Sequence, residues 1–291
     1  MQTYLIYTFI ALFLFGFQVF MYKLSAFRKC NSALTTLSFM ITVAILSVVA
    51  FFITHGKIEN AWLILLFGIL NSIFFLITTI TRMEALKHIP TSVSYPIIRM
   101  GTIIVVIFSL IYFKDSLSYY QILGIILALV VIFILSKNEE KEKTKNFKLG
   151  IWLTIAALIT IALTGITQKF ASLHVDKLPY IAISYVINIF LSWALLTKLS
   201  DKTKITKKQK QQRTRDAWII GFFAGLFNFF AFYSILTAYS IGPLAIAAPL
   251  HDMNFVIAMV ISAIFLKEKI TTRRVIGVIL SIVAAILLSL S

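Results

Sequence analysis

The chain has 291 residues, of which 60% are hydrophobic and only 13% are charged, and its mean hydropathy is +0.95. Soluble domains are roughly half apolar, so this composition excludes a soluble protein and predicts one that resides in a lipid bilayer. The formal net charge of +16 does not indicate a nucleic-acid partner, because the basic residues stand in short segments between long apolar runs.

Ten apolar runs of membrane-spanning length account for most of the chain. A helix needs roughly 20 largely apolar residues to cross a bilayer. The runs lie at about 4–22, 33–53, 61–82, 90–112, 119–136, 149–168, 179–197, 217–239, 243–266 and 271–290. They are apolar on every side and lack the period-two alternation of a membrane barrel. We therefore predict an all-α integral membrane protein with ten transmembrane helices.

The sequence indicates neither a metal site nor a cofactor site. Its one cysteine, Cys30, and its four histidines show no metal-ligand spacing. The H-E-x-x-H pattern of metalloproteases and the Gly-rich loop that binds nucleotide phosphates do not occur. We expect no metal, no cofactor and no enzymatic activity.

The two halves of the chain repeat each other. At an offset of 153, residues 85–136 align with 238–289 without a gap. The matched residues are Pro90 with Pro243, Pro96 with Pro249, Lys114 and Asp115 with Lys267 and Glu268, and Gly124 with Gly277. We predict a five-helix repeat at 1–136, a charged connecting loop at 137–148 and a second repeat at 149–291. Because five is odd, the second repeat enters the membrane from the opposite side, so the repeat is inverted.

Inverted repeats are typical of secondary transporters, in which two equivalent halves expose a midplane site alternately to each side. We therefore expect a secondary transporter that exports or exchanges a small polar metabolite. One alternative is a duplication kept only for packing. Another is a membrane enzyme or a lipid-handling scaffold without a polar path through the membrane.

The motifs resemble those of a known family. The segment A-x-x-x-x-P-x-x-x-x-x-P opens the fourth and ninth runs, and the turns F-K-D-S-L and L-K-E-K-I precede the fifth and tenth. With ten helices in two halves, the whole chain resembles the EamA-like branch of the drug/metabolite transporter superfamily. That family commonly has Gly-Glu where this chain has Lys114-Asp115 and Lys267-Glu268. The resemblance implies efflux or uptake of amino acids, metabolites or drugs, commonly coupled to an ion.

The distribution of basic residues predicts the orientation. Segments after odd-numbered runs hold 22 of the 27 Lys and Arg residues, and segments after even-numbered runs hold four. By the positive-inside rule we expect a cell-membrane protein with its basic loops, including a solvated loop from Lys198 to Asp216, in the cytoplasm and both termini outside. Members of the resembled family are often drawn with cytoplasmic termini, so charge and resemblance disagree, and we follow the charge.

Three ionisable residues lie well inside the apolar runs: Arg99, His251 and Asp252. Such residues are costly in lipid and usually face a cavity or the interior of a helix bundle. The offset of 153 makes Arg99 and Asp252 equivalent. Each follows a proline by three residues, Pro96 or Pro249, which frees a backbone carbonyl and favours a cavity wall. The alternative is a buried salt bridge, with Pro90, Pro96, Pro243 and Pro249 serving only to bend helices.

The positions of Arg99 and Asp252 along their helices place their backbones about 8 Å apart in depth, from a rise of 1.5 Å per residue. Either the long Arg side chain closes this gap directly, or a solute bridges it. A zwitterionic amino acid fits the second case, with its carboxylate on the guanidinium and its ammonium on Asp252.

Other polar residues inside the runs are secondary candidates for the solute site: Gln18, Tyr22, Asn71, Tyr95, Asn228 and Asn254. Their alternative is hydrogen bonding between helices. His251 either relays protons beside Asp252 or is simply packed against it. Lys23 and Lys169, at the ends of the first and sixth runs, are expected to extend to the interface.

The expected partners are a small-molecule solute and the lipid bilayer. A coupling proton carried by Asp252 and passive exchange are equally compatible with the sequence. The sequence does not fix the oligomeric state.

Overall fold

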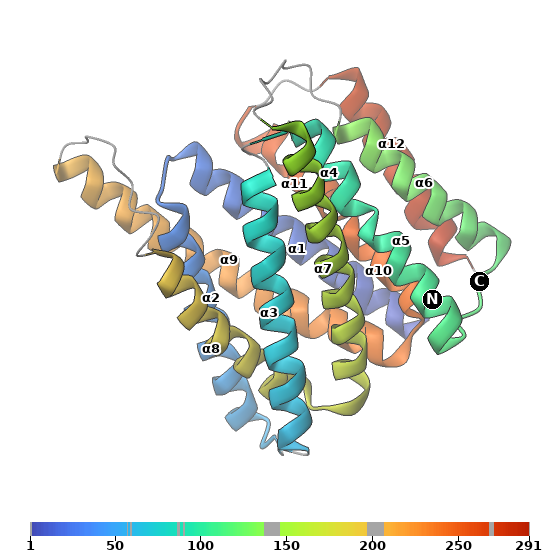
Figure 1. Cartoon of the computed structure of the whole chain (residues 1–291), viewed down its shortest axis with the longest axis horizontal. Coiled ribbons are helices and arrows are strands. Elements are labelled where there is room, and N and C mark those ends of the chain that lie inside the picture. The colour runs from blue at the N-terminus through green and yellow to red at the C-terminus, as the bar shows by residue number, and fades with distance from the viewer. Residues whose placement is uncertain are drawn as a thin grey trace.

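The computed structural model describes residues 2–56, 58, 60–85, 88–89, 91–136, 146–196, 207–267 and 271–290. Every regular element within these ranges is a helix (Figure 1). Seven helical segments are long and apolar enough to cross a membrane, and the shorter apolar segments Ile97–Phe113 and Tyr119–Leu135 accompany them. The expectation of an all-α integral membrane protein is confirmed.

The first half of the chain contains α1 (Thr3–Phe27), α2 (Ser32–Ile53), α3 (Ala61–Ala85), α4 (Thr91–Arg99), α5 (Gly101–Phe108), the π-helical turn η1 (Ser109–Phe113) and α6 (Tyr119–Ser136). The second half contains α7 (Phe147–His174), α8 (Lys177–Leu196), α9 (Lys207–Ile241), α10 (Leu244–Asp252), α11 (Asn254–Phe265) and α12 (Thr272–Ser289). Side-chain caps start several of them: the Asn31 side chain accepts hydrogen bonds from two backbone N–H groups of α2, and Asn146 accepts one from Leu149.

The bounds of the helices repeat at the same offset as the sequence. Adding 153 to the bounds of α4 and α6 gives the bounds of α10 and α12. Lys114, after η1, and Lys267, after α11, both have left-handed backbone conformations, with φ of 57° and 53°. The correspondence between halves therefore extends to single backbone angles.

Helices α6 and α12 pack against each other through equivalent glycines (Figure 1). A Cβ on Gly124 would lie 2.9 Å from Leu288 Cγ, and one on Gly277 would lie 2.4 Å from Leu135 Cδ2. The start of each helix thus meets the end of the other, so the two helices run antiparallel.

The remaining packing follows the same correspondence. α1 packs on α9 as α7 packs on α3, α2 packs on α9 as α8 packs on α3, and α1 packs on α11 as α7 packs on α5. α10 lies against α5 in the centre. The largest buried cluster gathers side chains such as Phe39 of α2, Val105 of α5 and Tyr180 of α8.

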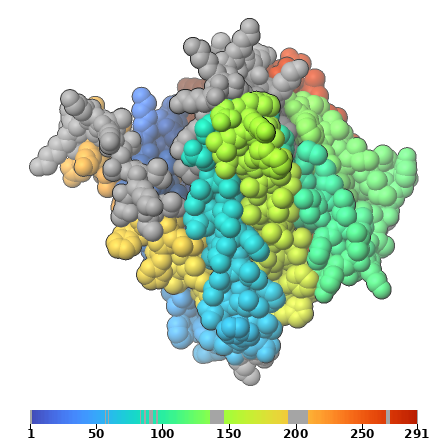
Figure 2. All heavy atoms as spheres, in the orientation of Figure 1, coloured from blue at the N-terminus to red at the C-terminus, as the bar shows by residue number. Residues whose placement is uncertain are grey.

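Large apolar side chains cover the outer face of the helices. Figure 2 shows α3, α7, α5 and α6 forming one continuous face. Among the exposed apolar side chains of these helices, Ile73, Ile107 and Ile159 are 43%, 50% and 47% exposed. Exposed apolar surface of this extent is unfavourable in water and suits a hydrocarbon environment.

Helix α9 is longer than the apolar run it contains. It begins at Lys207, ten residues before that run, so 207–216 is helical and the expectation of a solvated loop there is wrong; 198–206 lies outside the described residues. Its first two turns are rich in Lys, Gln and Arg, which are good helix formers when solvated. At about 1.5 Å per residue α9 spans about 52 Å, more than the roughly 30 Å hydrocarbon core.

The fourth and ninth apolar runs are each interrupted. Met100 separates α4 from α5, and Met253 separates α10 from α11. At both points the backbone tightens to an i→i−3 bond, from Met100 N to Ile97 O (3.1 Å) and from Met253 N to Leu250 O (3.3 Å). Each interruption lies directly after a charged residue of the sequence-predicted pair.

The close approach of α9 to α2 predicts the effect of adding a single methyl group. A Cβ on Gly221 would lie 2.5 Å from the Thr35 carbonyl oxygen, which belongs to the backbone. Gly221→Ala should therefore lower the free energy of unfolding by about 1–3 kcal/mol. The thermal midpoint of detergent-purified protein, followed by Trp fluorescence, measures the change.

The matched control is Gly165→Ala in α7, where the nearest atom, Val105 Cγ2, would lie 3.4 Å away. That variant should be neutral, or more stable by up to about 1 kcal/mol from helix propensity. Equal midpoints for the two variants would contradict this account of the packing.

Candidate functional site

Arg99 and Asp252 meet where the two interrupted helices cross. Arg99 is the last residue of α4 and Asp252 the last of α10, and α10 packs on α5. Arg99 Nη1 donates a hydrogen bond to Asp252 Oδ1 at 3.0 Å. Of the two geometries that the sequence left open, this structure contains the direct ion pair.

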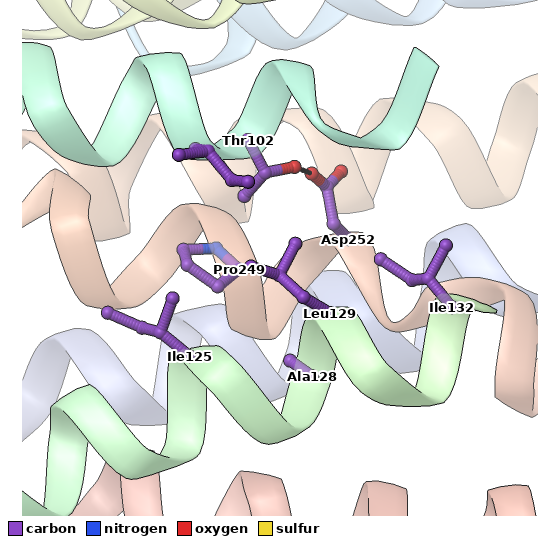
Figure 3. Close-up of a pocket in the computed structure, with 8 residues that line it drawn as sticks. Thr102, Ile125, Ala128, Leu129, Ile132, Pro249 and Asp252 are labelled. Atoms are coloured by element: carbon purple, nitrogen blue, oxygen red, sulfur yellow. Dashed lines mark hydrogen bonds between the residues drawn. The ribbon is translucent and has the colours of Figure 1, made fainter. Parts of the chain in front are cut away.

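Each member of the pair contacts the residue three positions after the other member, and these two residues, Thr102 and Phe255, are also equivalent at the offset of 153. The Thr102 hydroxyl donates a hydrogen bond to Asp252 Oδ2 (Figure 3). The Phe255 ring lies under the Arg99 guanidinium, with 5.8 Å between the Arg99 Cζ and the ring centroid. Sequence reasoning missed both, although each stands three residues after a charged member of the pair.

The ion pair is only partly exposed and has little free space beside it. The Arg99 and Asp252 side chains are 21% and 23% exposed. A cavity of about 10 Å³ adjoins Asp252, enough for about one water molecule. Its lining residues, most of them in Figure 3, are Thr102, Ile103, Ile125, Ala128, Leu129, Ile132, Pro249 and Asp252. A solute can enter at this contact only if the helices move apart.

Two buried polar atoms, on residues close to Asp252 in the sequence, have no hydrogen-bond partner among the residues that the structure describes. They are His251 Nε2 and Asn254 Oδ1. The other ring nitrogen of His251, Nδ1, lies 3.6 Å from Asp252 Oδ1, and the edge of the ring meets Phe15 at 4.7 Å between centroids. Asn254 is 6% exposed. Buried polar atoms are normally paired, and four further side-chain atoms of the described residues, His88 Nδ1, Tyr180 OH, Ser184 Oγ and Ser262 Oγ, are also unpaired.

Gln18, Tyr22 and Asn228 belong to one hydrogen-bonded chain. Tyr185 donates to Asn228 Oδ1 (2.6 Å), Asn228 donates to Gln18 Oε1 (2.9 Å), and Gln18 donates to the Tyr22 hydroxyl (2.9 Å). These hydrogen bonds join α8, α9 and α1. In α1, Gln18 lies about one turn after Phe15, whose ring contacts His251. Tyr185 was not found from the sequence, because its own segment shows no motif.

Asn71 lies in a separate pair, between α3 and α7. It accepts a hydrogen bond from Gln168 of α7 at 3.2 Å. Asn71 and Asn228 each end a G-x-x-N segment, at 68–71 in α3 and 225–228 in α9. The two amides therefore occupy corresponding places, one in each half.

The four prolines differ in their placement. Pro249 is buried inside α10, and Pro243 stands before α10 as its N-cap residue. Pro96 falls within α4, but its side chain and that of Tyr95 lie outside the described residues, as does Pro90. Of the four, only Pro249 has a described ring placed within a helix.

Lys169 does not extend to the interface, so that expectation is wrong. The residue is 6% exposed, and its ammonium donates to the backbone carbonyls of Tyr239 and Gly242 (2.9 Å for Gly242), at the end of α9. Asp115 holds the other side of the same turn, because it accepts from Ala245 N at 3.1 Å at the start of α10. A cation on helix carbonyls and an anion at a helix N-terminus are both favourable.

This arrangement, which we call the terminal-side clamp, consists of Lys169, Asp115 and the turn 241–243. It lies at the end of the bundle that carries the chain termini (Figure 1). An open cavity of about 380 Å³ adjoins it, lined by Lys114, Asp115, Ser116, Lys169, Ser240, Ile241, Gly242 and Pro243. Within the described residues, no group of three or more His, Cys, Asp or Glu side chains could hold a metal ion.

Known proteins resemble the chain over most of its length. An uncharacterized transporter from Archaeoglobus fulgidus is 26% identical over 216 residues, which cover 74% of this chain and 72% of that protein. A protein with a known crystal structure shares the fold with a TM-score of 0.78 at 13% identity, over 99% of this chain and 96% of the other. Residues 2–137 and 148–290 each match the EamA-like transporter family. The chain is a membrane protein that belongs to the EamA-like transporter family.

Proposed function

We propose that the protein is a secondary transporter that exports or exchanges a small polar metabolite such as an amino acid. Its ten spans form two inverted five-helix repeats, and the solute binds near the midplane between them. The observation that carries the proposal is the contact between Arg99 and Asp252, since equivalent residues of the two halves meet there with opposite charge. A site that uses both halves is what alternating access requires.

The packing of α6 against α12 supports the inverted arrangement. Equivalent helices that run antiparallel, with Gly124 on Leu288 and Leu135 on Gly277, are related by a two-fold axis perpendicular to the helices. For helices that cross the membrane, such an axis lies in the membrane plane.

A difference between the halves supports alternating access. At the terminal side α7 packs on α9, and Lys169 joins them. The corresponding helices, α1 and α3, make at most marginal contact within the described part of the chain. The halves thus share their architecture but differ in this contact between helices, and alternating access requires two halves that can differ in this way.

The chemistry of the pair favours a zwitterionic solute. The Arg99 guanidinium offers a planar set of donors that suits a carboxylate, and Asp252 suits an ammonium group. A zwitterion can replace the ion pair with two equivalent contacts, so neither buried charge loses its partner as the helices separate. Asp252 is also the carboxylate best placed to carry a coupling proton.

For orientation, we propose that the basic segments lie in the cytoplasm and both termini outside. The long α9 supports this, because its basic first turns extend beyond Trp218, which is 43% exposed where the apolar run begins. The hydrogen bond from Gln121 Nε2 to Leu290 O (2.9 Å) places the C-terminal end beside the start of α6.

The site assignment predicts a specific mutant pattern. Arg99→Gln and Asp252→Asn should each reduce transport at least about tenfold, since a hydrogen bond to a charged group contributes about 1.5–3 kcal/mol. The double variant should remain inactive. Uptake into proteoliposomes is measured with whichever amino acid raises the thermal midpoint of the purified protein.

A purely structural pair behaves differently. Each single change would then lower protein yield by stranding a buried charge, and the double neutral variant would recover both yield and transport. That recovery would overturn the site assignment. The control is Arg28→Gln with Asp216→Asn, an ion pair at 3.5 Å whose Arg28 side chain is 49% exposed, and transport should persist in it.

The proposed orientation predicts the labelling of introduced cysteines. Gln211→Cys in α9 should resist an impermeant maleimide added to intact cells, and Ser116→Cys, before α6, should react. Gln211 and Ser116 are both exposed, so neither position is shielded by the fold itself. Labelling of position 211 from outside, with position 116 protected, would reverse the orientation.

The native Cys30 provides a low background for this experiment. It lies between α1 and α2 and is 8% exposed, and burial raises the pKa of its thiol. A raised pKa keeps the group as the unreactive thiol at neutral pH, with the thiolate forming only as the pH rises further. In permeabilised cells at pH 7, Cys30 should therefore label more slowly than the thiol introduced by Gln211→Cys, and its labelling should quicken as the pH is raised.

A further inference from the structure

We propose that the end of α1 and the start of α9 together bind the headgroups of anionic phospholipids. The surface, which we call the basic shoulder, consists of Arg28, Lys29, Lys210, Arg213 and Arg215. This lipid site is independent of the proposed function, because it concerns the lipid around the protein and not the solute that crosses the membrane.

The basic shoulder is assembled from two parts of the chain that pack together. α1 packs on α9, and Arg28 Nη1 lies 3.5 Å from Asp216 Oδ2, which joins the end of α1 to the first turns of α9. The Cys30 thiol, just after α1, lies close enough to both Arg28 and Arg213 for their positive charges to act on it. Basic side chains from segments about 185 residues apart therefore form one patch, in which Asp216 offsets one positive charge.

The positive charges of the patch are accessible from outside the protein. The Arg28 side chain is 49% exposed although it pairs with Asp216. Lys29, Lys210 and Arg215 are exposed as well, and Arg213 is partly exposed. An anionic group can therefore approach the patch without any movement of the helices.

Exposed aromatic rings lie directly beside these charges. Phe27, next to Arg28, is 67% exposed. Trp218 and Phe222 follow Arg215 by three and seven residues, so they lie on the same face of α9, and they are 43% and 48% exposed. Exposed Trp rings at the end of an apolar run mark the boundary between hydrocarbon and headgroups. Arg215, about 4.5 Å further along the helix than Trp218, is therefore at headgroup depth.

The slant of α9 brings its first turns over the surrounding lipid. Figure 1 shows α9 crossing the bundle at a slant to α3 and α7, with its first turns projecting sideways beyond α2. The headgroup layer is roughly 5–8 Å thick on each side of the hydrocarbon. On an upright helix Lys210, eight residues before Trp218, would lie about 12 Å outside the boundary. The slant keeps it closer to the headgroups.

The combination of charges and rings determines the kind of ligand. Guanidinium and ammonium groups suit phosphate oxygens, and basic clusters at the end of a membrane helix attract anionic lipids. The acyl chains of such a lipid also cover Trp218 and Phe222, which a soluble phosphate would leave bare. The choline cation of phosphatidylcholine opposes the patch, so we expect selection for a lipid of net negative charge.

The experiment measures which lipid lies next to Trp218. The full-length protein with Trp62, Trp152 and Trp193 replaced by Phe is reconstituted in phosphatidylcholine. Quenching of the remaining Trp fluorescence by dibrominated phosphatidylglycerol is compared with quenching by dibrominated phosphatidylcholine at the same mole fraction. The anionic lipid should show an affinity at least about fivefold higher, and salt should reduce this preference.

A second single-Trp protein provides a positional control. It keeps only Trp62, at position 62 near the start of α3, which is 72% exposed. Residues 58–61 before it contain no Lys or Arg. The two brominated lipids should quench Trp62 about equally, because no basic patch adjoins it in the sequence.

Variants of the single-Trp218 protein separate a local site from the overall charge. Lys210→Gln with Arg215→Gln should bring the preference close to one, while quenching by the brominated phosphatidylcholine stays unchanged and shows that Trp218 still faces lipid. The matched control, Lys148→Gln with Arg274→Gln, removes two positive charges at the starts of α7 and α12. It should keep the preference of the parent protein.

Equal quenching of Trp218 by the two lipids in the parent protein would overturn the site. So would a preference that survives in Lys210→Gln with Arg215→Gln. A preference that the control variant loses to the same extent would mean that the anionic lipid responds only to the overall charge of the protein, and the site would again be overturned. Each of these results leaves the transporter proposal untouched.

Discussion

The ion pair between Arg99 and Asp252 is the contact at which equivalent residues of the two halves meet. Each charge alone would be unfavourable in a largely apolar bundle, and each has the other as its partner because α4 and α10 end close together. Thr102 holds the second carboxylate oxygen, and Phe255 lies against the guanidinium, so both side chains are fixed. The pair joins the halves at equivalent residues, and any opening between them has to break it or replace it.

Close packing of helix backbones holds the bundle together around the ion pair. Helices in lipid gain little from burying apolar side chains against each other, so they associate through small residues and polar contacts. Gly221 and Gly225 bring α9 against α2, and Gly124 and Gly277 bring α6 against α12. Side-chain hydroxyls add bonds between helices, such as Ser72 to the Ser184 carbonyl (2.9 Å) and Ser38 to the Trp218 carbonyl (2.8 Å).

Helix α10 links the ion pair to the terminal-side clamp. It is nine residues long, with Asp115 on its first turn and Asp252 at its last residue. Its residues from Leu244 to Leu250 are all buried, so it is closely packed along most of its length. The helix thus connects the ion pair to the turn that Lys169 holds.

The sequence by itself determined the membrane class, the position of the apolar segments and the equivalence of Arg99 with Asp252. These follow from local rules: a helix that crosses lipid needs a long apolar run, and a repeat in register identifies equivalent residues. The ten-span inverted topology and its orientation stay predictions. Only the tertiary structure decided that the charges pair directly, that Thr102 and Phe255 contact the pair, that Lys169 caps α9, and that Asn254 and His251 have unpaired atoms. These features join segments far apart in the chain, 153 residues for the ion pair, or depend on which way a side chain turns, and no local pattern specifies either.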